Sequence, residues 1–176
     1  MIVFKGIHPE LFRLSLLLAS AVFLIALFPT AATAQPVVQS NHGAWQIQCD
    51  TPERSTLELC ALVQNVFDPE RPNVELRVTV VRTLDGGGHI FRVAAPLGVL
   101  LEAGMGLRVD TTDLGTADFV VCLPSGCYIE MIMDQRLTSA LSGGETAWFL
   151  IYRAVDEGIG IPIDLAGFAD GFAALE

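Results

Sequence analysis

Lysine is almost missing from this 176-residue chain, since Lys5 is the only one among ten basic residues. The chain has 20 acidic residues and a net charge of −10. A protein that neutralises nucleic-acid phosphates needs a basic face, whereas phosphate loops of the Walker type and Schiff-base enzymes need a lysine in the folded domain. The composition therefore argues against a nucleic-acid partner and against lysine-dependent catalysis.

Histidine, the usual general base, is also scarce. Beyond the first 34 residues only His42 and His89 remain. His42 lies beside Gly43 in a polar stretch, and His89 opens an expected strand, so we predict no catalytic role for either. No serine stands in the G-x-S-x-G elbow of a hydrolase. The residues that are present thus indicate no catalytic set.

The N-terminus has the three parts of a secretory signal peptide. Lys5 and Arg13 precede an apolar run at 14–28, and the small-residue triplet Ala32-Thr33-Ala34 follows. The run of 15 residues is shorter than the roughly 20 that a membrane span needs. We predict that residues 1–34 are a cleaved signal peptide, with a retained anchor as the alternative. The mature chain is then exported to the periplasm, the outer membrane or the outside, and it contains no transmembrane span.

Four cysteines follow the predicted cleavage site, an even number that suits an oxidising compartment. They allow three pairings, of which we predict the sequential one because Pro124-Ser125-Gly126 can turn the chain between the last two. The spacing lacks the repeated C-x2-C of zinc sites, so we predict neither a metal nor a cofactor. The predicted disulfide residues are Cys49, Cys60, Cys122 and Cys127.

The mature chain reads as a flexible leader at 35–43 followed by one mainly β domain at 44–176. Short runs rich in β-branched and aromatic residues alternate with turn residues, which is typical of an antiparallel β-sandwich or a barrel-like domain. Asp134 can cap a short helix at 135–141, and apolar spacing predicts a C-terminal helix at 167–175. The expected strands are 44–49, 58–66, 74–83, 89–95, 107–110, 118–123, 128–133, 146–153 and 159–165.

Two local features have competing interpretations. Asp110, Asp113 and Asp118 surround residues 111–117, which we interpret as an Asp-rich turn rather than a calcium loop, because the spacing does not match an EF-hand. The connection at 96–105 is unusually apolar, so it is either a buried edge strand or a patch for a partner or for self-association. The candidate patch residues are Leu97, Val99, Leu100, Leu101 and Met105. Trp45 and Trp148 lie in apolar strands and are expected in the core.

Several short motifs follow one another in a fixed order over residues 44–175. They include Trp45-Gln46-Ile47-Gln48-Cys49, Ala95-Pro96-Leu97-Gly98-Val99-Leu100-Leu101, Gly126-Cys127 and Ile161-Pro162-Ile163-Asp164-Leu165-Ala166-Gly167-Phe168. This ordered set resembles the invasion-associated locus B family of exported bacterial proteins. The resemblance implies an envelope protein with a mostly β domain, two cysteine pairs and no established catalytic residues.

These observations favour a non-enzymatic, disulfide-stapled protein of the periplasm or cell envelope that binds a protein or an envelope component. Its family resemblance adds a role in host interaction or in the envelope. A hydrolase that uses Asp or Glu on carbohydrate or cell-wall material is the alternative, and it would require two facing carboxylates in a pocket. A carrier of a small molecule or metal is a third hypothesis.

Overall fold

A computed structural model describes residues 36–52, 55–68 and 71–175 of the chain. In these ranges it contains eleven strands, two α-helices and one short 3-10 helix, which confirms a mainly β fold. The predicted signal peptide at 1–34 lies outside the described residues. Within those residues, no helix is long and apolar enough to cross a membrane.

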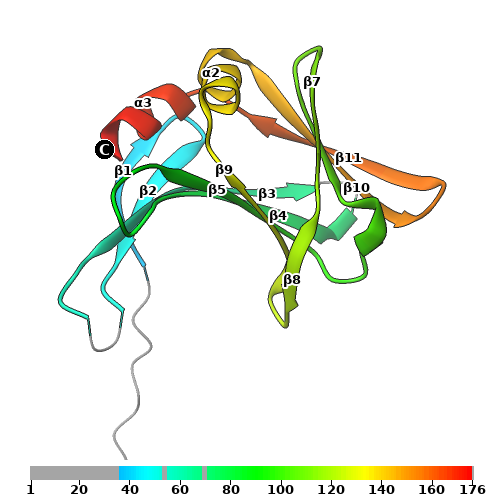
Figure 1. Cartoon of the computed structure of the whole chain (residues 1–176), viewed down its shortest axis with the longest axis horizontal. Helices are drawn as coiled ribbons and strands as arrows, with labels where there is room; N and C mark the ends of the chain where they lie inside the picture. The colour runs from blue at the N-terminus through cyan, green and yellow to red at the C-terminus, as the bar shows by residue number, and fades with distance from the viewer. Residues whose placement is uncertain (1–35, 53–54, 69–70, 176) are drawn as a thin grey trace, which may run out of the picture. The chain divides into compact units, whose positions relative to one another are not determined.

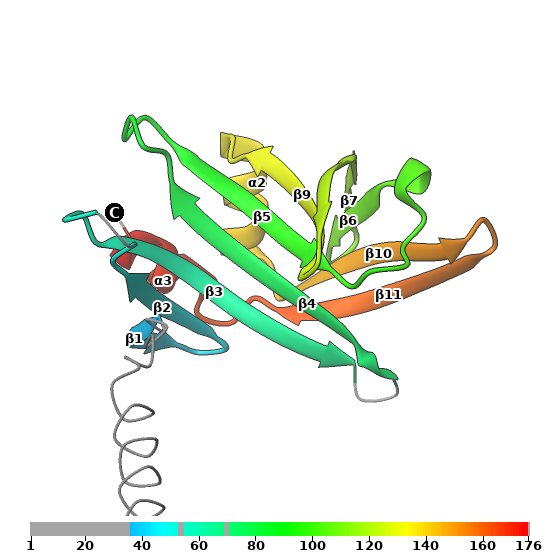
Figure 2. The ribbon, with the colours of Figure 1, turned by 90° about the horizontal axis from the view of Figure 1, so that it is seen from below.

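Seven strands form a large antiparallel sheet in the order β1-β2-β3-β4-β5-β9-β8 (Figure 1). Figure 2 shows β1 to β5 side by side in this order, so neighbours along the chain are also neighbours in the sheet. The strands are β1 (Val37–His42), β2 (Trp45–Asp50), β3 (Leu59–Asp68), β4 (Arg71–Arg82), β5 (His89–Ala95), β8 (Phe119–Leu123) and β9 (Gly126–Ile132).

Four strands form a small antiparallel sheet in the order β11-β10-β6-β7. Only Asp118 separates β7 from β8, so the chain passes directly from the small sheet into the large one. Two separate sheets correspond to the sandwich form of the prediction. The strands are β6 (Met105–Val109), β7 (Thr112–Ala117), β10 (Thr146–Ala154) and β11 (Glu157–Asp164).

The core lies between the sheets and follows the period of two along each strand. Phe91 of β5 and Phe149 of β10 stack across it with ring centroids 6.1 Å apart. Burial of each large apolar side chain stabilises the fold by roughly 1.5–3 kcal/mol. The small sheet buries alternate residues of three strands: Met105, Leu107 and Val109; Ala147, Phe149 and Ile151; Ile159, Ile161 and Ile163. The residues between them therefore face away from the core.

The two predicted helices are present and lie side by side at one end of the domain (Figure 1). Helix α2 (Gln135–Gly143) begins after Asp134, whose carboxylate accepts a hydrogen bond from the Leu137 N–H at 2.7 Å. Helix α3 (Phe168–Ala174) begins with the buried Phe168, which packs edge-on against Trp45 with ring centroids 5.0 Å apart. Trp45 is therefore a core residue, as expected.

The N-terminal hairpin is locked against the start of α3 by two glycines. Gly43 and Gly167 both have positive φ, at 58° and 88°. A Cβ on Gly43 would lie 2.2 Å from the carbonyl oxygen of Ala166, and one on Gly167 would lie 2.1 Å from that of His42. Only residues without a side chain allow this close approach of two backbones.

Two segments differ from the sequence prediction. Residues 35–43 were expected to be a flexible leader, but 37–42 form β1, which pairs with β2 from Val37 opposite Cys49 to His42 opposite Trp45. Residues 111–117 were expected to be a turn, but 112–117 form β7. β7 contains a bulge at Leu114, because its neighbours Asp113 and Gly115 pair with consecutive residues of β6. Both are mostly exposed edge strands, so burial imposes no alternating pattern on their sequences.

Both predicted disulfides are confirmed. Cys49 bonds to Cys60, and Cys122 bonds to Cys127, which leaves no free cysteine. The members of each pair lie directly opposite one another, on β2 and β3 and on β8 and β9. Each disulfide thus staples one hairpin-connected pair of strands within the large sheet.

Candidate functional site

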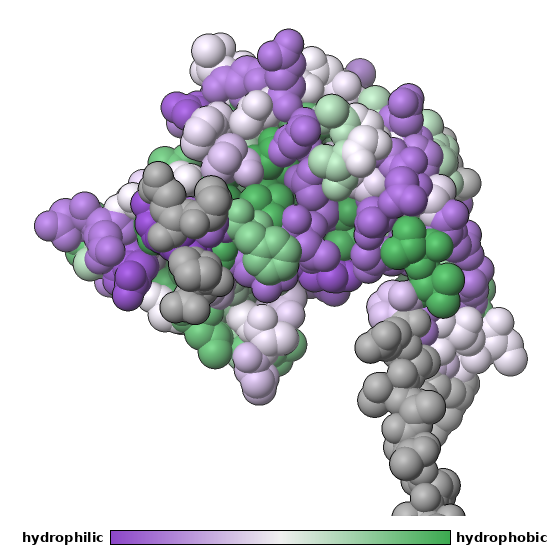
Figure 3. Space-filling view, turned by 180° about the vertical axis from the view of Figure 1, so that it is seen from behind, coloured by the Kyte–Doolittle hydropathy of each residue, from purple (hydrophilic) through white to green (hydrophobic). Residues whose placement is uncertain are grey.

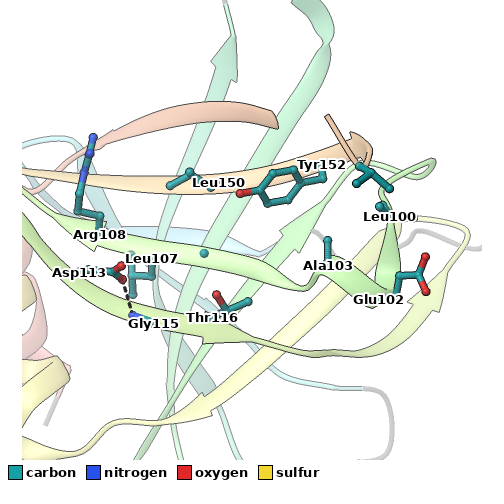
Figure 4. A pocket seen from close by; sticks show the side chains of 12 residues that line it. Leu100, Glu102, Ala103, Leu107, Arg108, Asp113, Gly115, Thr116, Leu150 and Tyr152 are labelled. Atoms are coloured by element: carbon teal, nitrogen blue, oxygen red, sulfur yellow. Dashed lines mark hydrogen bonds between the residues drawn. The ribbon is translucent and has the colours of Figure 1, made fainter. Parts of the chain in front are cut away.

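A groove of about 750 Å³ crosses the outer face of the small sheet, with walls from β6, β7, β10 and the connection that precedes β6 (Figure 4). This volume lies within the range of roughly 300–1,000 Å³ that is usual for ligand sites. Elsewhere, exposed large apolar side chains occur on several elements, among them Phe67 on β3 and, together on the edge strand β8, Val120, Val121 and Leu123. The face of the domain in Figure 3 is mostly hydrophilic, with separate hydrophobic areas.

A glycine forms the floor of the groove. Gly106 of β6 stands opposite Leu150 of β10 on one side and Thr116 of β7 on the other. A Cβ at Gly106 would lie 3.3 Å from the Leu150 Cβ, so a side chain there would crowd the groove. The missing side chain leaves a trough between Leu150 and Thr116.

Strand β10 supplies the apolar wall. Leu150 and Tyr152 face the groove because their neighbours Phe149 and Ile151 are buried in the core. The Tyr152 ring lies over Gly158 of β11, where a Cβ would be 3.0 Å from the ring carbon Cε1. Gly158 thus lets a half-buried aromatic ring lie against the sheet beside the groove.

The connection before β6 closes one end of the groove. The backbone N–H of Leu100 donates to the Tyr152 carbonyl oxygen at 2.7 Å, which fixes the connection to β10. The 3-10 helix η1 (Leu101–Ala103) follows, and Leu100, Glu102 and Ala103 line the groove. The connection therefore forms one wall of the groove.

The five predicted patch residues lie in different environments and do not share one surface. Met105 is fully buried, so its assignment to an exposed patch is wrong, because β6 points it into the core. Val99 is partly buried against the core, and together with Leu97 it lines a separate cavity of about 180 Å³. Leu97 and Leu101 are exposed by 57% and 49%. Of the five, only Leu100 lines the groove, and the patch as predicted is not one continuous surface.

An aromatic and a basic residue flank the other end of the groove. Trp148 is half-buried on the outer face of β10, so the expectation of core burial is wrong for this residue. The Arg108 guanidinium lies 5.7 Å from the centroid of the Trp148 ring, within the range of a cation–π contact. Figure 4 shows the Arg108 side chain extending away from Asp113.

Two carboxylates line the groove, at opposite ends of it. Figure 4 shows Glu102 near Leu100 and Asp113 near Arg108. The Asp113 carboxylate accepts the Gly115 N–H at 2.8 Å, which supports the bulge of β7. A hydrolase would need two facing carboxylates, and this arrangement does not provide them.

The other sequence candidates lie outside the groove. The Asp110 carboxylate accepts backbone N–H groups of Glu145 and Thr146 and does not meet Asp113 and Asp118 in a common cluster. The described residues contain one close set of potential metal ligands, Cys49, Glu58 and Cys60, and its two sulfurs form a disulfide.

Neither histidine lines the groove. His42 Nε2 lies 2.9 Å from the hydroxyl of Ser40 on β1, and the His89 ring lies 4.7 Å from that of Phe172 on α3. Both therefore take part in local packing outside the groove.

Sequence reasoning missed Gly106, Leu150, Tyr152 and Thr116, because only the register of three strands brings them together.

Comparison with known proteins agrees with this fold. The chain is 23% identical to Invasion protein B of Bartonella bacilliformis over 69% of its own length and 62% of the relative's. It is 26% identical to an Invasion protein B homolog of Brucella abortus (strain 2308), over 61% and 60% of the two lengths. The match thus spans about three fifths of each of these relatives.

A crystal structure of invasion associated protein B from Bartonella henselae has the same fold, with a TM-score of 0.66 and 21% identity over 81% of this chain and 95% of that one. The family model for the invasion associated locus B (IalB) protein matches residues 45–176. This match covers every strand and helix from β2 to α3 and leaves out β1. The chain therefore belongs to the invasion associated locus B family.

Proposed function

We propose that this chain is an exported, non-enzymatic binding protein of the cell envelope, and that the groove on the small sheet holds its partner. The observation that carries the proposal is the trough over Gly106, walled by Leu150 and Tyr152 and bordered by polar residues. An apolar wall bordered by polar groups is typical of a surface that binds another molecule.

Two further observations support export. The first 34 residues have the order of a secretory signal peptide, and both disulfides suit an oxidising compartment. The two relatives named above carry the name invasion protein B, which associates them with invasion. We extend this to a role of the present chain at the cell envelope or in contact with a host, in the periplasm, at the outer membrane or outside the cell.

Site-specific cross-linking tests the groove. In one variant of the full chain, a photoreactive amino acid replaces Tyr152. A matched variant carries the same amino acid at Phe67 on the large sheet, and both are expressed in bacterial cells. Phe67 is 62% exposed and lies outside the groove. We expect an adduct of one defined mass from position 152, its loss when Leu150→Ser is added, and no such adduct from position 67.

Equal adducts from both positions, or none from position 152, would contradict the proposal. Export is tested on the same material by fractionation and N-terminal sequencing. The expected result is an envelope protein that begins at Gln35 and has no thiol available for labelling. A cytoplasmic protein that still begins at Met1 would refute the export part.

A further inference from the structure

We infer that the groove takes an extended, basic segment of a partner protein, whose apolar side chains lie on Leu150 and Tyr152 while its Lys or Arg side chains reach Glu102 and Asp113. This inference rests on the proposed function, and it adds the chemistry of the partner. The charge and the shape of the small sheet support this inference.

Negative charge is concentrated on the small sheet. Residues 101–118 and 145–164, which form this sheet and its flanking turns, include eight acidic and two basic residues, a net charge of −6. All eight acidic residues are exposed. The chain as a whole, with 176 residues, has a net charge of −10. These 38 positions therefore hold more than half of the net charge, and their field attracts cations.

The two basic residues of the small sheet cancel only part of this charge. Arg153 pairs with Glu157 at 3.8 Å beside the β10–β11 turn. Arg108 lines the groove with its guanidinium over the Trp148 ring, and this contact leaves its positive charge in place, so Glu102, Asp113 and Arg108 give the lining a net charge of −1. Glu102 and Asp113 are exposed carboxylates at the two ends of the trough, and the Arg136 guanidinium of α2 donates to the Asp113 carbonyl oxygen at 3.2 Å, so the Glu102 end is the more acidic of the two.

The shape of the groove favours an extended segment over a compact ligand. The trough over Gly106 runs between the walls formed by Leu150 and Thr116, and Glu102 and Asp113 lie at its opposite ends. An extended segment can present apolar side chains to the middle and basic side chains to both ends. Rim charges of this kind steer encounter and select partners more than they add affinity.

The same charge disfavours other occupants. A second copy of this chain would bring two faces of −6 together, and like charges across an interface cost free energy. Nucleic acids and anionic lipid surfaces would be repelled for the same reason. A basic polypeptide is the macromolecule that gains from both the apolar wall and the carboxylates.

Opposite charges at one position test the inference. The full 176-residue chain is expressed, its exported form is purified, and a display library of random 12-residue peptides is selected on it. Dissociation constants of the enriched peptides are then measured for the wild type, for Thr116→Arg and for Thr116→Glu. Thr116 is exposed on the edge strand β7, so both long side chains can be accommodated, and thermal unfolding checks that each variant is folded.

We expect the enriched peptides to be rich in Lys and Arg, and Thr116→Arg to weaken their binding by about fivefold or more, because it adds a like charge. Thr116→Glu should leave the binding unchanged or tighten it. Leu150→Ser should weaken binding, as should Val155→Ser, which alters an exposed lining residue at the β10–β11 turn.

Each other outcome has a defined meaning. If Thr116→Arg and Thr116→Glu weaken binding equally while Leu150→Ser abolishes it, the partner is not basic but the groove remains a binding site. If neither Leu150→Ser nor Val155→Ser affects the enriched peptides, both this inference and the proposed function are wrong. A selection that enriches no peptide above background also overturns the inference.

Discussion

Trp45 and Asp164 lie 119 residues apart in the sequence, and the indole N–H of Trp45 donates to the backbone oxygen of Asp164 at 3.0 Å. The side-chain amide of Gln64 donates to the same oxygen, also at 3.0 Å. Trp45 and Gln64 belong to the large sheet, and Asp164 ends β11 of the small sheet. One carbonyl oxygen therefore joins the two sheets through two donors.

A double-mutant cycle tests this shared acceptor. Trp45→Phe or Gln64→Leu alone leaves the Asp164 oxygen with one donor, whereas the double variant leaves it with none. An unpaired buried polar group costs about 1–3 kcal/mol, so the double variant should lose about that much more stability than the sum of the single variants. Urea unfolding measures the free energies.

Part of each single effect has other causes. Trp45→Phe also removes buried apolar volume, whereas Gln64→Leu removes a buried Oε1 that has no donor among the described residues. The cycle separates these contributions from the shared hydrogen bonds. Additive effects, within about 0.5 kcal/mol, would show that the Asp164 oxygen does not couple the two donors.

The two disulfides should contribute unequally to stability. In the chain-entropy treatment, a bridge across 11 residues is worth about 3 kcal/mol and one across 5 residues about 2 kcal/mol. The pair Cys49→Ala and Cys60→Ala should therefore destabilise the fold more than Cys122→Ala and Cys127→Ala. Unfolding of the two double variants in urea, without reductant, gives the comparison, and the reverse order would contradict it.

The close approach of Gly43 to the backbone before α3 gives a steric prediction. Gly43→Ala places a Cβ 2.2 Å from the Ala166 oxygen at positive φ, whereas Gly86→Ala, also at positive φ, meets nothing within 4 Å. The unfavourable φ alone costs roughly 1–2 kcal/mol, which is the expected loss for Gly86→Ala. Gly43→Ala should cost at least twice as much, as measured by thermal unfolding. Equal losses would show that the two backbones separate easily.

Asp85 should titrate below its ordinary pKa. The Thr83 hydroxyl, and after it the Gly87 N–H, donate to this carboxylate, and both hydrogen bonds lower its pKa below 3.8. A lowered pKa in the folded state means that the associated stabilisation is present above about pH 4 and is lost as the pH falls through the folded value. NMR titration of the Asp85 carboxyl carbon should show the low pKa.

Variants at Thr83 separate the hydroxyl from the turn. Thr83→Val should raise the pKa of Asp85 toward its ordinary value because it removes the largest cause of the shift. Thr83→Ser keeps the hydroxyl and should preserve the low pKa. An unchanged titration in Thr83→Val would assign the shift to the backbone alone.

The fold was largely predictable where burial dictates the sequence pattern. Strand β10 alternates Ala147, Phe149 and Ile151 with outward residues, and this period is visible without a structure. Strand β1 has no buried residue, and β7 contains a bulge and Gly115 at positive φ. Neither contains the alternation that burial produces, because each lies at the edge of a sheet.

The groove was much less predictable, since it depends on pairing between distant segments. Gly106 is an isolated glycine in the sequence, and it becomes a floor only when β6 stands between β10 and β7. The apolar composition of the connection at 96–105 predicts either a patch or a buried strand. The direction of each side chain decides whether a residue of this connection lies in the core or at the surface. Composition gives no information on that direction.

Both disulfides close short hairpins inside the large sheet, so no disulfide joins the two sheets, which are held together by the connecting chain and by noncovalent packing. Cross-linking can therefore be completed on each hairpin before distant parts of the chain meet, and it cannot trap the sheets in a wrong arrangement. Loss of the packing between the sheets would therefore leave both disulfides intact. For this fold, oxidation fixes two hairpins of the large sheet and leaves the docking of the small sheet to noncovalent contacts.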